Sequence, residues 1–213
     1  MKMYRCAMTM LLFLCAMMAV ACGPSSTTSA PAPQAAAPAP KKEPVLYAGK
    51  SCLSQMAGLA ARWQQDALPF HMESSLNAES TGHDGKSTVW HALFASARTR
   101  TYKAFACSGS QLREEPAVGV TSASDTPYAP NVPQLMFPMF YLHTDSDEAF
   151  RLAQEKGGAK LLEMDPQQPV MYLLDWDAKN KQLLWVVVYG TSAKDAKGKV
   201  VVDAGTGKFL RAA

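Results

Sequence analysis

The sequence predicts an α+β fold of two tandem modules, each a helix followed by an antiparallel sheet. Three observations support this prediction. Apolar residues recur first at helical and then at strand spacing, this order occurs twice, and two stretches about 95 residues apart match each other. We expect the first module at 45–112, a Pro-rich apolar connection at 113–143 and the second module at 144–213.

The first module is expected to open with a helix over 51–68 that Pro69 ends. Its apolar side chains follow steps of three and four: Leu53, Met56, Ala60, Trp63 and Ala67. Alternating apolar residues then predict strands near 70–76, 89–96 and 102–108, with the polar stretch STGHDGKST as a turn.

The second module repeats this order. Asp145 is predicted to cap a helix that Gly157 and Gly158 close, and strands are expected at 160–164, 170–176, 182–189 and 199–203. Trp90 aligns with Trp185, which indicates a duplicated unit. Chance matching of common strand residues is the alternative.

Residues 1–21 are predicted to be a lipoprotein signal peptide. Two positive charges precede an apolar run that is too short to span a bilayer. The run ends in Ala-Val-Ala-Cys, which resembles the box in which Cys22 is acylated and becomes the first mature residue; an ordinary secretory signal is the alternative. We therefore expect a lipid-anchored protein of the bacterial cell envelope. In a Gram-negative cell, Gly23 favours the outer membrane over the inner one.

Residues 22–44 combine the acylated cysteine with a tether of Pro, Ala, Ser and Thr that has too few apolar side chains to fold. Without Lys2 and Arg5, 19 basic residues face 18 acidic ones, so the charge predicts no nucleic-acid partner. Cys52 and Cys107 remain as a pair in an exported domain, which predicts a disulfide; two free thiols are the alternative.

The motif search predicts no catalytic residue, no metal site and no cofactor. The four histidines are scattered, and the chain has no H-E-x-x-H, C-x-x-C or G-x-S-x-G pattern. The G-T-G-K at 205–208 lacks the upstream glycine of a phosphate-binding loop, and Phe209 stands where that loop has Ser or Thr. We expect a hairpin turn there, with Asp203 bonded to the turn backbone.

The last strands carry a family resemblance. Residues 199–210, KVVVDAGTGKFL, resemble the end of a PepSY domain, and 185–189 and 145–149 resemble its preceding strand and its helix start. The resemblance covers 145–210 and implies a helix packed across an antiparallel sheet, as in cystatins. The first half departs from it, because Cys107-Ser108-Gly109-Ser110 replaces Asp-Ala-Gly-Thr.

PepSY domains occur in propeptides of secreted peptidases and in envelope proteins, and peptidase inhibition has been proposed for them. The resemblance therefore implies a non-enzymatic module that binds a protein or peptide and restrains a secreted or periplasmic peptidase. A structural or assembly lipoprotein that holds another envelope protein is the alternative, and a small hydrolase is the third hypothesis.

The connection holds the densest apolar run outside the signal peptide. It consists of Leu135, Met136, Phe137, Met139, Phe140 and Tyr141. Two interpretations are open: these side chains form the seam between the modules, or they form a binding edge for a partner.

Overall fold

The computed structural model describes residues 42–213, and nearly all of its strands belong to one antiparallel sheet. The predicted signal peptide, the acylated Cys22 and most of the tether lie outside the described residues. The order of strands across the sheet is β11 (Phe209–Ala212), β10 (Gly198–Asp203), β9 (Gln182–Tyr189), β8 (Val170–Asp177), β2 (Leu68–Ser74), β4 (Val89–Ser96), β5 (Thr101–Ser108) and β6 (Gly119–Ser122). The short β7 (Thr126–Pro127) also pairs with β5, while β1 (Tyr47–Ala48) and β3 (Lys86–Ser87) form a separate pair.

The two halves of the chain meet at the centre of this sheet. Strands β2 and β8 are each the first strand of the large sheet after a helix, and they pair antiparallel through only three aligned positions. By contrast, β8 and β9 align over eight. Strands therefore follow chain order outward from this junction on both sides, and residues about a hundred positions apart in sequence lie side by side there.

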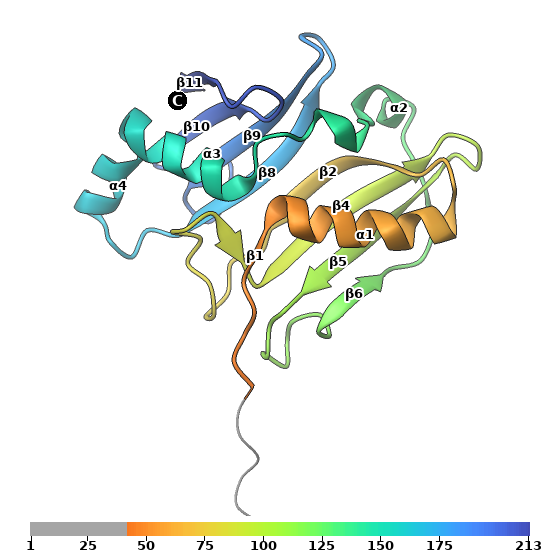
Figure 1. Ribbon diagram of the computed structural model, residues 1–213, viewed down its shortest axis with the longest axis horizontal. Helices are drawn as coiled ribbons and strands as arrows, with labels where there is room; N and C mark the ends of the chain where they lie inside the picture. The colour runs from red at the N-terminus through yellow and green to blue at the C-terminus, as the bar shows by residue number, and fades with distance from the viewer. Residues whose placement is uncertain (1–41) are drawn as a thin grey trace, which may run out of the picture. The chain divides into compact units, whose positions relative to one another are not determined.

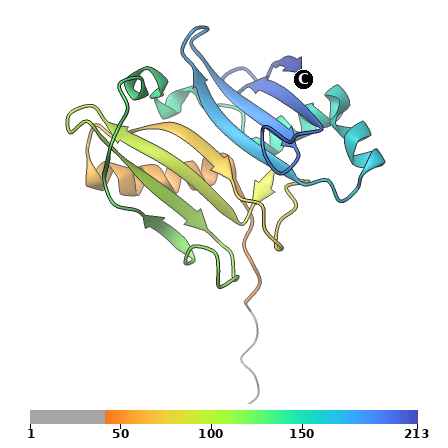
Figure 2. The same cartoon turned by 180° about the vertical axis from the view of Figure 1, so that it is seen from behind.

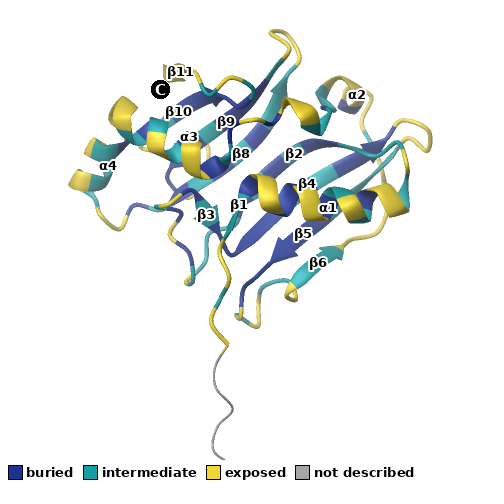
Figure 3. Ribbon diagram, in the orientation of Figure 1, coloured by how far each residue is buried: buried dark blue, intermediate teal, exposed yellow. Residues whose placement is uncertain are grey.

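The main helices cover one face of the sheet. Helix α1 (Gly49–Trp63) packs on β4 and β5, and α3 (Ser146–Ala153) packs on β9 and β10. Figure 1 shows both helices in front of the strands, and Figure 2 shows the opposite face with neither of them across it. We call that second face the open face. The buried residues of α1 recur at the predicted three- and four-residue spacing. Figure 3 shows buried and exposed stretches alternating along this helix.

Two tryptophans form the centre of the core. Trp90 and Trp185 are fully buried, with ring centroids 6.1 Å apart. The Trp90 indole donates a hydrogen bond to the Tyr47 carbonyl, and Trp185 donates to that of Thr144, each at 2.9 Å. Tyr47 and Thr144 each stand two residues before a helix, so the two aligned tryptophans make equivalent contacts.

The starts of α1 and α3 also bind each other. Gly49 N–H donates to the Ser146 hydroxyl and Lys50 N–H donates to the Asp145 carboxylate, both at 2.8 Å. Asp145, the residue before α3, also accepts from the N–H of Ser146, the first residue of that helix. A Cβ atom at position 49 would lie 2.6 Å from the Trp185 ring, so only glycine permits this close approach.

Two predicted elements were wrong. The stretch 160–164 is helix α4 (Ala159–Met164) rather than a strand, because Gly157, at φ 110°, kinks the helix within η2 (Gln154–Gly158) without ending it. The first helix ends at Trp63, and the next strand already starts at Leu68. Pro69 lies inside that strand, and the pairing register shifts beside it, which accommodates a residue that has no N–H to donate.

The G-T-G-K stretch forms a turn, as the sequence predicts. Strands β10 and β11 pair antiparallel on either side of it, and the Asp203 carboxylate accepts from the N–H groups of Gly205 and Thr206. Only Gly207 adopts a positive φ here, at 67°.

Candidate functional site

Alternation along the two junction strands places polar side chains on the open face. Met72 of β2 and Leu174 of β8 are buried in the core under the helices. Their neighbours His71, Glu73 and Asp175 are half-buried and point to the other side, because successive strand residues face opposite ways. The β2–β8 register sets His71 directly opposite Asp175.

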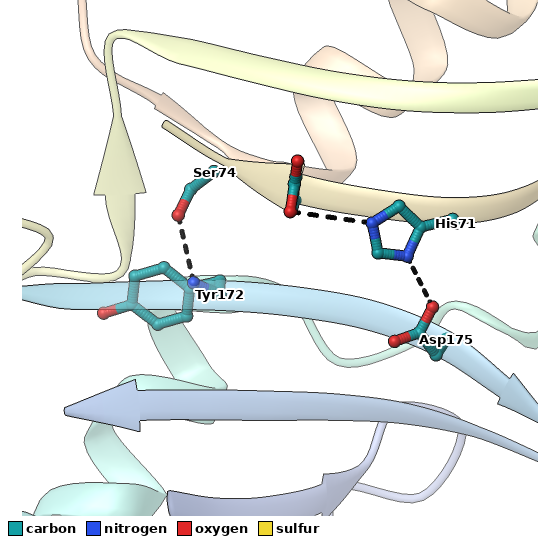
Figure 4. A network of polar contacts seen from close by, with 5 residues as sticks. His71, Ser74, Tyr172 and Asp175 are labelled. Carbon is teal, nitrogen blue, oxygen red and sulfur yellow. Dashed lines mark hydrogen bonds and ion pairs between the residues drawn. The ribbon is translucent and has the colours of Figure 1, made fainter. Parts of the chain in front are cut away.

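These three side chains form one charged cluster. His71 Nδ1 lies 2.6 Å from Asp175 Oδ1, and His71 Nε2 lies 3.7 Å from Glu73 Oε2. Figure 4 shows the imidazole beside the Asp175 carboxylate, and Ser74 accepting a hydrogen bond from the Tyr172 N–H on the neighbouring strand. The exposed fractions of the His71, Glu73 and Asp175 side chains are 30%, 44% and 45%, so the cluster can reach a partner.

The carboxylates keep His71 charged. Burial acts to lower the pKa of this imidazole, but the hydrogen bonds with Asp175 and Glu73 outweigh it and raise the pKa to about 9. The contact with His71 lowers the pKa of Glu73 in turn. At neutral pH the cluster is therefore a cation held between two anions.

This arrangement is poorly suited to general-base catalysis. Both ring nitrogens of His71 face carboxylates, and an imidazole with a pKa of about 9 already carries its proton at neutral pH. What the cluster offers instead is a set of half-exposed charges that span the junction between the two halves of the sheet.

A depression of about 590 Å³ lies beside the cluster. Its walls combine the apolar side chains of Leu76, Met171 and Leu173 with the polar ones of Glu73, Thr191 and Ser192. Apolar contact area with charged groups at its border is a composition that protein–protein interfaces use.

No group of three or more His, Cys, Asp or Glu side chains within 42–213 is placed to hold a metal ion. Within the same range, no helix is long and apolar enough to cross a membrane.

The predicted disulfide is present. Cys52 on α1 and Cys107 on β5 are bonded, with Cα atoms 5.6 Å apart, and both residues are buried. The bond joins the first helix to the sheet beneath it.

The six apolar residues of the connection do not act as one surface. Phe137 is fully buried in the main core, Met139 packs against that core, and Leu135 and Met136 pack against a smaller cluster of Phe70, Ala95 and Val132. Phe140 and Tyr141 are 68% and 39% exposed, and their rings lie 4.5 Å apart. The connection, which includes α2 (Val132–Leu135) and η1 (Met139–Tyr141), thus contributes side chains both to the core and to the surface.

The His71 cluster was missed by sequence reasoning. His71 and Glu73 stand two positions apart in a predicted strand, which indicates a shared face. Asp175 lies 104 residues from His71, and only the pairing of β2 with β8 brings them together. The internal repeat contained a usable signal. If the two modules are expected to join through their first strands, the repeat predicts that the strand of His71 lies beside that of Asp175.

Comparison with known proteins yields a likeness of fold. No protein-family model matches the chain, and no curated protein matches it in sequence. A crystal structure of "a putative lipoprotein" from Clostridium difficile 630 is similar, with a TM-score of 0.51 and 10% sequence identity. The match covers 76% of this chain and 91% of that one. At this identity the two proteins share an α+β architecture with an antiparallel sheet.

Proposed function

We propose that the protein is an envelope-anchored lipoprotein that binds another protein or peptide without catalysing a reaction, and that the open face at the β2–β8 junction is its contact surface. The single observation that carries this proposal is the His71–Glu73–Asp175 cluster, which sets half-exposed charges beside a partly apolar depression.

The physical chemistry of this surface supports recognition of a macromolecule. Half-buried Met171 and Leu173 provide apolar area, and the charged groups add orientation because their partners must match them in sign. The sheet backbone fixes both before any partner arrives, which keeps the entropic cost of association low.

The proposal of a lipid anchor is based on the sequence. The Ala-Val-Ala-Cys box at 19–22 supports acylation of Cys22, and the fold likeness to a protein described as "a putative lipoprotein" agrees with it. Several acyl chains on one cysteine would hold the chain firmly at a membrane. We propose the outer membrane if the cell is Gram-negative.

The PepSY-like duplication is also a proposal. It is supported by the strand order, which runs outward from the junction in both halves, and by the equivalent hydrogen bonds of Trp90 and Trp185. If the two halves are PepSY-like modules, the bound protein would be a secreted or periplasmic peptidase that this protein restrains. In the alternative, the partner is another envelope component that the protein holds in place.

Affinity capture tests the contact surface. Residues 45–213, produced with the disulfide intact, serve as bait in an envelope extract beside two variants. Leu173→Lys changes the open face, and Met164→Lys makes the same substitution type at an exposed position of α4. We expect a protein that the wild type and Met164→Lys retain and that Leu173→Lys loses. Equal retention by the wild type and both variants would refute the assignment of the face.

The captured protein then separates the functional alternatives. If it is a peptidase, saturable inhibition by the bait supports restraint, and a stable complex without effect on proteolysis supports the assembly role. Turnover of a substrate by the bait itself, abolished by one polar substitution, would overturn the non-enzymatic proposal.

A further inference from the structure

The described part of the sheet ends in β11 on one side and in β6, followed by the short β7, on the other. Strands β11 and β6 differ in how they are protected against pairing with another strand. Strand β11 carries a register shift opposite Val201 and Val202 and an exposed Arg211, and a bulge and a charge both discourage pairing with another strand. Strand β6 pairs with β5 without any shift, and the stretch from Val118 to Ser124 contains no charged residue and no proline. Natural proteins usually guard such an edge.

The hydrogen bonds of β6 show which backbone groups are free. The Ala123 N–H donates to the Ala104 carbonyl at 2.8 Å. Because hydrogen-bonded and non-bonded pairs alternate in an antiparallel ladder, Thr121 and Gly119 also turn their backbone groups toward β5. Val120 and Ser122 therefore turn their N–H and C=O groups outward, where they can pair with another strand.

Contacts on both sides of β6 tie this edge to the rest of the fold. Val120 aligns with Cys107, whose disulfide ties β5 to α1. Just beyond β6, Asp125 accepts a hydrogen bond from the Trp63 indole at 2.9 Å and lies 2.8 Å from Lys103 Nζ. A strand that docks here meets a preformed template, so little ordering is required of this protein.

We propose that β6 binds an extended, uncharged segment of another protein as an additional strand of the sheet. Free N–H and C=O groups in strand geometry are complementary to the backbone of another strand, so the occupant is recognised mainly through its own backbone. Val118, 59% exposed immediately before β6, offers contact to an apolar side chain of that segment. A second copy of this chain is a poorer occupant, since two such short edges would bury little of the roughly 800 Å² per partner typical of stable interfaces.

A designed peptide tests this edge directly. The probe is a fluorescent peptide of alternating threonine and valine with one lysine at each end, titrated into the full chain in detergent and followed by anisotropy. Its control carries N-methyl groups on two adjacent central residues, which removes the donors on both edges of the peptide. We expect the probe to bind and its methylated form not to bind.

Matched proline substitutions locate the contact. Val120→Pro and Ser122→Pro each remove one outward N–H, and we expect each to weaken probe binding by about tenfold. Ala212→Pro makes the same change on the guarded β11 edge and should leave binding unchanged; there the mutual hydrogen bonds of Lys199 and Ala213 turn the Ala212 N–H outward. Unchanged binding in the folded β6 variants, or a loss only in Ala212→Pro, would overturn the proposal.

Hydrogen exchange on the unmutated protein gives a second readout that does not depend on the variants folding. The amides of Val120 and Ser122 should become protected when the probe saturates, while that of Thr121 is protected throughout. Absence of new protection would count against strand addition.

A wild type that sediments as a dimer while Val120→Pro is monomeric would replace the proposed partner with a second copy of the chain. The open-face variant Leu173→Lys should bind the probe normally, so failure here is distinguishable from failure of the proposed function.

Discussion

At the scale of single residues, His71 is the side chain whose protonation links the two halves of the sheet. Its ring lies between a carboxylate of its own strand and one of β8. Losing the proton would leave the two carboxylates facing a neutral ring. The stability of the fold should therefore depend on pH through this residue.

The direction follows from the raised pKa of His71. The pKa is about 9 in the folded state, against 6.5 without the surrounding structure. The stabilisation is therefore complete below pH 6.5 and is lost as the pH rises to 9 and beyond. We expect the difference in unfolding free energy between the wild type and His71→Gln to shrink by on the order of 2 kcal/mol over that interval. Urea denaturation of both proteins at several pH values measures it.

Comparing the two proteins cancels groups that titrate alike in both. On the acid side, Glu73 has a lowered pKa, so its contribution is present above its ordinary pKa and is lost as the pH falls through the lowered one. A difference between wild type and His71→Gln that stays constant from pH 6 to 10 would show that the cluster does not stabilise the junction.

At the scale of elements, the connection contains two phenylalanines with opposite surroundings. Phe137 is fully buried and Phe140 is 68% exposed, although they stand three positions apart. We expect Phe137→Ser to lower the free energy of unfolding by about 3–5 kcal/mol, since it empties a core site and buries a hydroxyl. Phe140→Ser should change it by less than about 0.5 kcal/mol. Thermal melts followed by circular dichroism compare them, and equal losses would contradict the assigned burial.

The disulfide between α1 and β5 gives a second prediction at this scale. It links residues 55 positions apart. Replacing both Cys52 and Cys107 with Ala should therefore lower the free energy of unfolding by about 2–4 kcal/mol, chiefly because the unfolded chain gains conformational entropy. Guanidinium denaturation measures the loss. Adding a reductant should destabilise the wild type to a similar extent and leave the double variant unaffected; a reductant-insensitive wild type would argue against the bond.

The helices and strands also show where sequence patterns are enough to predict the structure. Strands β4 and β9 coincide with the predicted 89–96 and 182–189, because β-branched and aromatic residues there specify an extended conformation. The strand predicted at 160–164 was wrong because the six residues of Ala159–Met164 are too few to distinguish a helical from a strand pattern. The candidate site could not be predicted for another reason. The contact of His71 with Asp175 depends on which strands become neighbours, and no local sequence pattern encodes that pairing.

At the scale of the whole molecule, the junction of β2 and β8 joins the two halves into a single sheet and creates the open face at its centre. Helices α1 and α3 cover the other side, so the junction offers side chains from both halves to one partner (Figure 2). The central claim is that this face, rather than the helical side, contacts the bound protein.

Photo-cross-linking in intact cells tests that claim most directly, because it uses the full chain in its own envelope. A benzoylphenylalanine placed at Leu173 reports on the open face, and one at the exposed Met164 of α4 reports on the helical side. We expect a discrete cross-linked product from position 173 and none from position 164. A product from position 164 alone, or none from either position, would contradict the assignment of the open face as the binding surface.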